Sequence, residues 1–530
     1  MKNEFANLRE LIKYSAEKFA DNIAFKIKKK DEKGKTFYDE VTYTRLSADI
    51  EHLARCLMNH HLAGERIAVI GKNSYEWVVS FVAVTACGGV IVPLDRGLLD
   101  FEIEEQLSRS QAVAIFYGEA FKERLAEKTD IIKVCMDDSE FADMLAEGAA
   151  ADNKEAYENI QIDVNVMSIL LFTSGTTSAS KAVMLSQYNV VENVIGLRKW
   201  ETLYPTDVNM ALLPFHHTFG MVQTLFFLSE GMCNVFCEGL RVGKCLTEYG
   251  VSVFVGVPRV LDEMYLTISR KLEAQGMVKK VNFALKLSRV LMKIGIDVRR
   301  KLFAKIIDAL GGKLRFIIVG AAPATPEVLR WFNDIGVLSV QGYGLTETSP
   351  VISAENENHM REGSVGLTLP GVEARIVNPD ENGIGEIVAK GPNVMLGYYN
   401  DQAQTDEVIR DGWFYTGDLG RIDKDGYIFI SGRKKNVIVL SNGKNVFPEE
   451  IEALVSQCDA IKECIVYGEG DDILLKVVRD KSFDGDCDKE IENHVKSVNE
   501  KLIYYKQIKS YVITDEEMEK TTTGKIKRYV

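Results

Sequence analysis

The chain has 530 residues, of which 46% are hydrophobic and 27% charged, and its formal net charge at pH 7 is -13. Such a chain has about three or four structural units or two unequal domains, and its composition excludes disordered, collagen-like and disulfide-scaffold proteins. The acidic balance also argues against a nucleic-acid-binding protein, because clustered Lys and Arg supply most of the affinity for polyphosphate surfaces.

Cysteine and histidine usage indicates reduced thiols. Nine cysteines are scattered from Cys56 to Cys487, and the closest pair, Cys233 and Cys237, lacks the two-residue spacing of a redox or zinc motif. Four of the seven histidines form adjacent pairs, at 60–61 and 216–217, and neither pair is beside a Cys cluster, so we expect no structural metal site. The N-terminal MKNEFANLRE has mixed charges and no apolar core, so no secretory signal is expected and the protein is predicted to be cytoplasmic.

The first two-thirds of the chain alternate β-rich apolar runs with segments of helical periodicity. The runs are RIAVI (66–70), GVIVPL (89–94), AVAIFY (112–117), SILLF (168–172), NVFCE (234–238), SVFVGV (252–257), FIIVG (316–320) and LSVQGYG (338–344). Alternation of this kind predicts parallel sheets covered by helices, so we expect an α/β protein with two doubly wound sheets.

An uncharged stretch from Trp77 to Leu94 just reaches the lower length limit of a membrane span. Gly88, Gly89 and Pro93 favour instead the end of a buried helix, a turn and a buried strand. We therefore expect no integral membrane span.

The pattern changes twice in the last third. From about Gly366, short strands separated by turn signals predict hairpins and a small β-barrel or sandwich. After Arg433, the strands NVIVL (436–440), IKECIVY (461–467), ILLKVV (473–478) and SYVIT (510–514) alternate with two helices, the first opening at Pro448. We therefore predict a large N-terminal domain, residues 1–432, and a small mobile α+β domain, residues 433–530.

A hydroxyl-rich loop follows SILLF directly. Thr173-Ser-Gly-Thr-Thr-Ser178 offers five hydroxyls and backbone donors that can wrap phosphate oxygens, and Lys181 adds a positive charge. It is not a Walker A motif, and a Ser/Thr-rich surface turn has the same composition. The loop alone therefore leaves both interpretations open.

Four further motifs follow in order, namely QGYGLTETSP (341–350), WFYTGDLG (413–420), ISGRKKNVIVLSNGKNVFPEEIE (430–452) and TTTGKIKR (521–528). With the loop they resemble the adenylate-forming superfamily of acyl-CoA synthetases, adenylation domains and luciferases, over nearly the whole chain. The helical segment from Arg270 to Ala322 most resembles the long-chain fatty acid-CoA ligases. The resemblance implies ATP, Mg²⁺ and coenzyme A, and a two-step reaction through an acyl-adenylate.

The resemblance also implies which residues hold the phosphates and the metal. Lys181 and the loop are expected to hold the β and γ phosphates of ATP. The loop residues are Thr173, Ser174, Gly175, Thr176 and Thr177. Glu347 is expected to hold Mg²⁺ with help from Thr173, since Mg²⁺ prefers hard carboxylate oxygens. Thr346, the residue before Glu347, is also expected to be catalytic.

Two segments rich in small residues resemble the walls of an adenine site. They are Gly320, Ala321, Ala322 and Pro323, and then Gly342, Tyr343 and Gly344. Small residues admit a flat base, on which Tyr343 can stack. Asp418 and Arg433 resemble the ribose contacts, since a carboxylate can accept hydrogen bonds from both ribose hydroxyls.

The remaining roles implied by the resemblance concern the acyl substrate and the mobile domain. Lys525 resembles the lysine that bridges the substrate carboxylate and the α-phosphate, delivered by a closing domain. Lys435 falls at the hinge position, and Gly443 would let the pantetheine of coenzyme A approach the backbone. His217, in LPFHHTFG (213–220), resembles a histidine that lines the acyl channel, although a His pair at a strand end can also be plain packing.

The loop departs from the family pattern at three positions. Ser178, Ser180 and Ala182 stand where Gly, Pro and Gly are usual, and any of them that needed φ > 0 would be strained by about 1 kcal/mol or more. Gln187 stands where His is common.

The segment 270–305 is basic in an otherwise acidic chain, with eleven Lys and Arg against two acids. Val281, Leu285, Leu287 and residues 290–294 interleave the charges, a pattern that suits an anionic membrane surface. The alternative is a solvated helical face.

Taken together, these features predict activation of a carboxylic acid, a medium- or long-chain fatty acid, to acyl-adenylate and then to acyl-CoA, with release of pyrophosphate and AMP. One alternative is transfer of the acyl-adenylate to the pantetheine of a separate carrier protein. Another is a nucleotide- or fatty-acid-binding protein that has lost catalysis.

Overall fold

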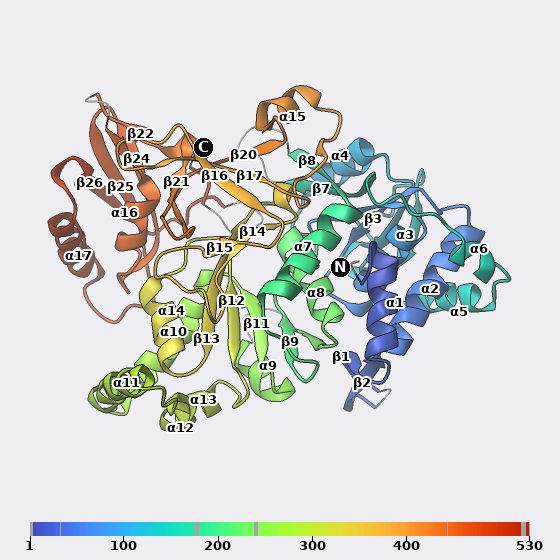
Figure 1. Ribbon diagram of the computed structural model, residues 1–530, viewed down its shortest axis with the longest axis horizontal. Coiled ribbons are helices and arrows are strands. Elements are labelled where there is room, and N and C mark those ends of the chain that lie inside the picture. The colour runs from blue at the N-terminus through green and yellow to red at the C-terminus, as the bar shows by residue number, and fades with distance from the viewer. Residues whose placement is uncertain are drawn as a thin grey trace. The chain divides into compact units, whose positions relative to one another are not determined.

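The structure is a computed structural model that describes residues 4–31, 33–173, 180–237, 242–441, 444–520 and 526–528. The chain forms two compact units (Figure 1). The first comprises residues 1–173, 181–373 and 390–407, and the second comprises residues 174–180, 374–389 and 408–530.

Within the described residues, the first unit contains a seven-stranded sheet in the order β18-β8-β7-β4-β3-β5-β6. Its strands are β3 (Arg66–Ile70), β4 (Val90–Leu94), β5 (Ala114–Tyr117), β6 (Ile132–Cys135), β7 (Met167–Thr173), β8 (Lys181–Ser186) and β18 (Gly397–Tyr398). β3 to β7 run parallel, whereas β8 and β18 are antiparallel to their neighbours. The strands β4 and β5 are continuously apolar and buried, as expected for parallel strands covered by helices on both faces.

The other large sheet of this unit has, among the described residues, nine strands in the order β15-β14-β13-β12-β11-β9-β10-β1-β2. They are β1 (Ile23–Lys30), β2 (Thr36–Thr42), β9 (Val208–Ala211), β10 (Cys233–Phe236), β11 (Val253–Gly256), β12 (Phe316–Val319), β13 (Leu338–Gly344), β14 (Val351–Ala354) and β15 (Leu367–Thr368). The central strands are parallel, and β2, β14 and β15 add antiparallel edges. The prediction of two doubly wound sheets is confirmed.

Helices connect the strands of these sheets (Figure 1). They are α1 (Leu8–Lys18), α2 (Tyr43–Asn59), α3 (Tyr75–Ala86), α4 (Asp100–Ser110), α5 (Ser139–Ala150), α6 (Lys154–Glu158), α7 (Gln187–Trp200), α8 (Thr218–Ser229), α9 (Val242–Tyr249), α10 (Pro258–Ala274), α11 (Val278–Lys293), α12 (Arg299–Leu302), α13 (Ala304–Ala309), α14 (Pro326–Asp334) and α15 (Gln402–Val408). The uncharged stretch from Trp77 forms most of α3, a turn and β4, as predicted. Across the part of the chain that the structure describes, no helix is both long and apolar enough to cross a membrane.

The side chain of Gln187, the first residue of α7, forms hydrogen bonds to both α1 and α3. Its side chain is buried, its amide oxygen accepts a hydrogen bond from the backbone N–H of Leu8 (2.9 Å), and its amide nitrogen donates to the carbonyl of Thr85 (3.0 Å). A buried amide must satisfy both of its polar ends, and these two backbone partners do so. The glutamine at this position therefore ties together three helices that are distant in sequence.

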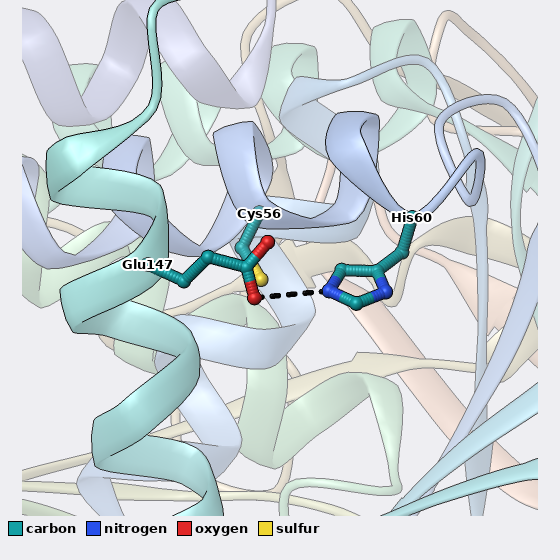
Figure 2. A group of neighbouring side chains, drawn as sticks. All are labelled: Cys56, His60 and Glu147. Carbon is teal, nitrogen blue, oxygen red and sulfur yellow. Dashed lines mark hydrogen bonds and ion pairs between the residues drawn. The ribbon is translucent and has the colours of Figure 1, made fainter.

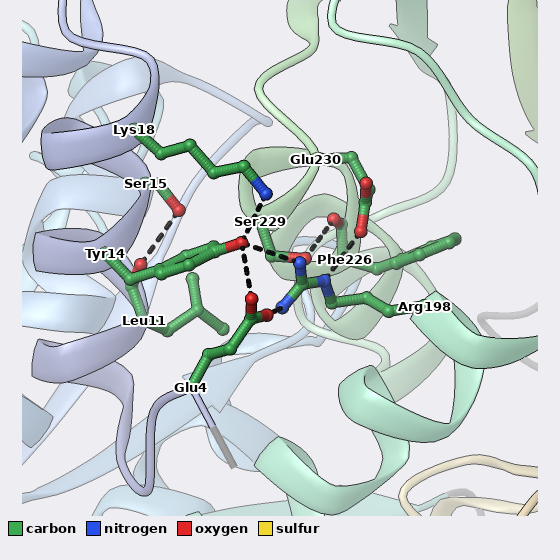
Figure 3. Close-up of polar contacts among 9 residues, drawn as sticks. All are labelled: Glu4, Leu11, Tyr14, Ser15, Lys18, Arg198, Phe226, Ser229 and Glu230. Carbon is green, nitrogen blue, oxygen red and sulfur yellow. Dashed lines mark hydrogen bonds and ion pairs between the residues drawn. The ribbon is translucent and has the colours of Figure 1, made fainter. Parts of the chain in front are cut away.

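Arg198, near the end of α7, is a second fastening point for the N-terminal segment (Figure 3). Its guanidinium lies 2.5 Å from Oε2 of Glu4 and 2.6 Å from Oε1 of Glu230, and it donates to the hydroxyl of Tyr14 at 2.9 Å. It also lies over the rings of Phe5 and Tyr14. The Arg198 side chain is only 13% exposed and that of Glu230 only 21%, so loss of the arginine would leave a largely buried carboxylate without its cation.

The second unit contains, within the described residues, a five-stranded sheet, a two-stranded sheet and a three-stranded sheet. The strands are β16 (Glu373–Val377), β17 (Gly385–Lys390), β19 (Ile409–Arg410), β20 (Trp413–Ile422), β21 (Ile428–Arg433), β22 (Ile438–Val439), β23 (Asn445–Val446), β24 (Ile461–Glu469), β25 (Asp472–Arg479) and β26 (Ile508–Thr514). The strands expected to form a small β-barrel build the five-stranded sheet β16-β17-β20-β19, with β21 paired to β20.

The C-terminal part of this unit has its own hydrophobic core. Helices α16 (Pro448–Val455) and α17 (Cys487–Lys501) bury Ile451, Val455, Ile491 and Val495 against β24, β25 and β26. The expected small α+β fold is confirmed. The predicted strand 436–440 is shorter than expected, because the 3₁₀ turn η3 (Lys434–Asn436) precedes β22.

We predict that Arg198→Met lowers the free energy of unfolding of the first unit by about 2 kcal/mol, because Glu4 and Glu230 lose their cation. Differential scanning calorimetry should show a thermal midpoint lower by a few degrees. Lys199→Met, which removes the exposed basic residue beside it, is the matched control and should leave the midpoint within a degree or so. Equal midpoints for the two variants would contradict the role given to Arg198.

Candidate active site

Three neighbouring strands bring together residues that are far apart in the sequence. Thr173, the last residue of β7, pairs with Lys181, the first residue of β8, and its hydroxyl donates to the carbonyl of Lys181 at 3.5 Å. On the other side of β8, β18 pairs with it in antiparallel, and the backbone N–H of the next residue, Tyr399, donates to the carbonyl of Ala182 at 2.8 Å. Ala182 lies in a regular strand, so its replacement of the usual glycine causes no φ > 0 strain.

Tyr398 lies between Lys181 and Glu347. The ammonium of Lys181 is 3.4 Å from the Tyr398 hydroxyl oxygen, to which it donates, and 4.7 Å from the centre of the ring. The same hydroxyl donates to Oε1 of Glu347 at 2.9 Å. One phenol therefore positions a cation and a carboxylate at once. Sequence reasoning did not select this tyrosine, and the signal that could have found it is the Gly-Tyr-Tyr run at 397–399.

Glu347 reaches this position because the chain turns sharply after β13. A Cβ at Gly344 would lie 1.8 Å from the carbonyl oxygen of Pro350, so only glycine allows the chain to double back here. The short helix η2 (Thr346–Thr348) follows and packs beside β8, with Thr346 and Glu347 half-buried. The backbone N–H of Met395 donates a hydrogen bond to the carbonyl of Glu347 at 2.9 Å.

The two predicted adenine segments lie at the carboxyl ends of two neighbouring parallel strands of the nine-stranded sheet. β12 and β13 are parallel neighbours with Val319 opposite Gln341, so residues 320–323 and 342–344 lie next to each other in space. The segment after β12 is Gly320, Ala321, Ala322 and Pro323, of which the last three are exposed. The segment at the end of β13 is Gly342, Tyr343 and Gly344. The Tyr343 side chain is 9% exposed, so most of its ring packs inside the unit.

Two carboxyl groups near these segments have raised pKa values. Burial raises the pKa of Glu355, which directly follows β14, to about 7. The backbone N–H groups of Gln341 and Arg361 donate to its two oxygens at 3.3 and 2.9 Å. Burial also raises the pKa of Asp262, on α10, to about 6. The sequence pattern gave no indication of either group, because both shifts follow from burial.

Glu347 has the donor chemistry that a magnesium ion requires. Its carboxylate is half-buried and accepts a hydrogen bond from the Tyr398 hydroxyl. Thr173, the last residue of β7, offers a hydroxyl as a further oxygen donor. Mg²⁺ takes oxygen ligands and is bound through one or two carboxylates together with substrate phosphates. These residues therefore fit the metal that the sequence predicted.

His217 is the residue that precedes α8, where the loops after β4 and β9 meet. Nε2 of its neighbour His216 lies 3.3 Å from Oδ1 of Asp95, and the two imidazole rings are 4.3 Å apart. Donor atoms of the three residues all lie within 4.8 Å of one another. The structure therefore places His217 in a polar group with Asp95 and His216, neither of which the sequence reasoning selected.

The second unit holds the predicted ribose contacts and the predicted hinge residue. Asp418 and Arg433 are cross-strand partners on β20 and β21, with Nε of Arg433 2.7 Å from Oδ1 of Asp418. Asp418 is buried, so the arginine compensates a carboxylate that water hardly reaches. Lys435 is exposed in η3.

Several predicted residues lie outside the described residues. They are Ser174, Gly175, Thr176, Thr177, Gly443 and Lys525. Their assigned roles remain predictions.

Comparison with known proteins gives consistent matches in sequence and structure. Over 524 residues, the chain is 26% identical to the long-chain-fatty-acid–CoA ligase FadD15 of Mycobacterium bovis, which covers 88% of this chain and 86% of the relative. It is 30% identical over 461 residues to long chain acyl-CoA synthetase 4 of Arabidopsis thaliana, covering 77% and 68%. The fold matches ATP-bound MatB from Rhodopseudomonas palustris with a TM-score of 0.76 at 26% identity, covering 98% of this chain and 97% of that chain.

Two family matches together account for most of the sequence. Residues 435–530 match the family described as AMP-binding enzyme C-terminal domain. Residues 12–399, well over half of the chain, match the family described as AMP-binding enzyme. The chain therefore belongs to the AMP-binding enzymes, the adenylate-forming superfamily whose motifs it carries in order.

Proposed function

We propose that the protein is an ATP-dependent acid–thiol ligase of the long-chain fatty acid–CoA type. The substrate carboxylate attacks the α-phosphorus of ATP and releases pyrophosphate, and the thiolate of coenzyme A then displaces AMP from the acyl-adenylate. The observation that carries this proposal is the arrangement of Lys181, Tyr398 and Glu347 in a chain that resembles named long-chain ligases along most of its length.

The first step requires charge neutralisation, because a carboxylate must approach a triphosphate. Lys181 supplies a cation beside the phosphate loop, and the Tyr398 hydroxyl restricts its position. Glu347 and Thr173 would hold Mg²⁺, which when bound offsets charge on the phosphate oxygens. Tyr398 also prevents a direct Lys181–Glu347 pair from cancelling both charges.

We further propose the remaining nucleotide contacts. The adenine would lie between the segments 320–323 and 342–344, which lie at the carboxyl ends of the neighbouring strands β12 and β13. Asp418, fixed by Arg433, would accept hydrogen bonds from the ribose hydroxyls. Thr346 and the loop residues 174–177 complete the phosphate site in this proposal.

The proposal for the second half-reaction rests on the family resemblance. We propose a domain boundary between residues 432 and 433, with Lys435 as the hinge residue. Lys525 would bridge the substrate carboxylate and the α-phosphate during adenylation, and Gly443 would admit the pantetheine chain. His217, beside His216 and Asp95, would line the acyl channel near the carboxylate.

We also propose that this protein is cytoplasmic and contacts membranes peripherally through residues 270–305. The inner face of α11 buries Val281, Leu285 and Ser288. Its outer face and the following loop expose large apolar side chains, which are Phe283 (70%), Leu287 (41%), Val290 (59%), Ile294 (66%) and Ile296 (47%). Exposed apolar residues flanked by basic ones favour binding to an anionic bilayer surface.

The structure divides the basic residues of this insert into two groups. Arg289 forms an ion pair with Asp334, Arg299 donates to the carbonyl of Asn333, and Arg300 donates to the carbonyls of Leu314 and Gly336. These arginines fix the insert to the nine-stranded core. Lysines are exposed around the apolar face, and they are Lys279, Lys280, Lys286 and Lys293. The charge that faces a membrane therefore comes mainly from lysine.

We predict that the protein releases pyrophosphate from ATP and Mg²⁺ with fatty acids, and that it forms acyl-CoA when coenzyme A is added. A series from acetate to oleate, with acyl-CoA followed by mass spectrometry, identifies the chain length that gives the highest kcat/KM. Adenylate without thioester would indicate a carrier-protein acceptor, and no signal with any acid would favour a binding protein.

In the same assay Lys525→Ala should impair adenylation far more than transfer from a supplied acyl-adenylate.

We predict that Tyr398→Phe lowers kcat for ATP–pyrophosphate exchange by about 10- to 100-fold, since hydrogen bonds to charged groups contribute roughly 1.5–3 kcal/mol. The ring that lies under Lys181 is kept, so only the hydroxyl contacts are lost. Tyr399→Phe is the matched control, because that hydroxyl contacts Arg66 and Gln111 instead. If both variants behaved alike, Tyr398 would have no special positioning role.

We predict that the double variant Phe283→Ser and Ile294→Ser loses at least about tenfold in affinity for phosphatidylglycerol vesicles, because each buried apolar side chain contributes roughly 1.5–3 kcal/mol. Vesicle sedimentation at low and high salt measures this, and salt should weaken binding by the unmodified protein. Phe101→Ser, at an exposed site on α4, is the control. Absence of binding by the unmodified protein at low salt would end the proposal.

A further inference from the structure

We propose that Cys56, His60 and Glu147 form a zinc site in the first unit, separate from the candidate active site (Figure 2). None of the three contributes to the nucleotide or acyl contacts discussed above. The cysteine and histidine spacings in the sequence gave no indication of such a site, because Glu147 is 87 residues from His60 in the chain.

The three residues come from two helices that touch. Cys56 and His60 are four residues apart at the end of α2, so their side chains lie on one face. Glu147 lies on α5 and is followed by Gly148, at which a Cβ would lie 1.7 Å from the carbonyl oxygen of His52 on α2. Only glycine permits this backbone contact, and the contact brings Glu147 next to the end of α2.

The donor atoms already lie close together. Nε2 of His60 is 3.0 Å from Oε2 of Glu147, and Sγ of Cys56 lies within 4.8 Å of both. A tetrahedral zinc ion holds such S, N and O donors roughly 3.3–3.6 Å apart, as its bond lengths of about 2.0–2.3 Å require. Small side-chain movements would therefore suffice to bind the ion.

The site is closed on one side and open on the other. Cys56 is fully buried, whereas the His60 and Glu147 side chains are 51% and 44% exposed. A cavity of about 420 Å³ lies beside them, lined by His60 and Glu147 together with Asp143, Met144, Phe116 and Ile132. Three protein ligands with an open position are typical of a zinc ion that keeps a water molecule. Asp143, one turn before Glu147, offers a further oxygen.

The donor set selects zinc over the hard cations of the cell. Mg²⁺ and Ca²⁺ take oxygen ligands, whereas a thiolate with an imidazole and a carboxylate suits Zn²⁺. On binding, the Sγ–H bond of Cys56 breaks, the Sγ–Zn bond forms, and the proton passes to solvent. The bound ion would link the end of α2 to α5.

The test uses the full-length protein after treatment with a chelator, titrated with ZnCl₂ against a chromophoric chelator. Among the residues that the structure describes, two other groups offer possible ligands, Asp95 with the His216–His217 pair and Glu119 with Cys135 and Asp138, so the readout is the difference between variants. His60→Gln should remove one equivalent of binding, or weaken it at least about 100-fold, since even indirect partners of a metal cost 10- to 100-fold. His61→Asn is the matched control, because that exposed neighbour has a φ of 57° that asparagine tolerates.

Cobalt gives a second readout that a merely structural role would not affect. Co²⁺ in the unmodified protein should show a thiolate-to-metal charge-transfer band, and Cys56→Ser should abolish that band. Far-ultraviolet circular dichroism shows whether the Cys56→Ser variant, changed at a buried site, still folds. If it does not fold, the cobalt spectrum of His60→Gln, changed at an exposed site, serves as the test instead. Equal zinc binding by the unmodified protein and His60→Gln, or a cobalt complex without the band, would overturn the proposal.

Discussion

The pairing of β8 with β7 on one side and with β18 on the other determines where the charged groups of the candidate site lie. Side chains alternate between the two faces of a strand, so a slip of one residue in either pairing would turn Lys181 away from Tyr398. The register is held by buried apolar residues of β7 and β8, which cannot face water. The position of the Lys181 ammonium therefore depends on the packing of the seven-stranded sheet.

The neutral hydroxyl between Lys181 and Glu347 has an electrostatic consequence. A direct ion pair would satisfy each charge with the other and would have to be broken before either could meet a phosphate or a metal ion. The Tyr398 oxygen accepts from the lysine and its proton goes to the carboxylate, so both groups are oriented while neither is neutralised. Preorganised groups of this kind lower the cost of meeting charge that develops during a reaction.

Sequence patterns predicted the long apolar strands, the helix at Pro448 and the order of the motifs, because each depends on residues close in the chain. They missed β18, which has two residues and no detectable period, and with it Tyr398, whose contact with Lys181 spans 217 positions. Gln187 looked like an unexplained departure, although it satisfies the backbone of Leu8, 179 residues away. Contacts of such separation depend on the folded chain, and no local pattern encodes them.

In the insert 270–305, attachment to the core and surface charge depend on different residues. Arg289, Arg299 and Arg300 form hydrogen bonds to Asp334 and to backbone carbonyls, while the lysines of the insert are exposed to solvent. A planar guanidinium suits fixed, multidentate contacts, and a lysine ammonium remains hydrated and accessible. Acetylation of the lysines, or their replacement during evolution, could therefore change the surface charge of the insert without loosening its attachment to the core.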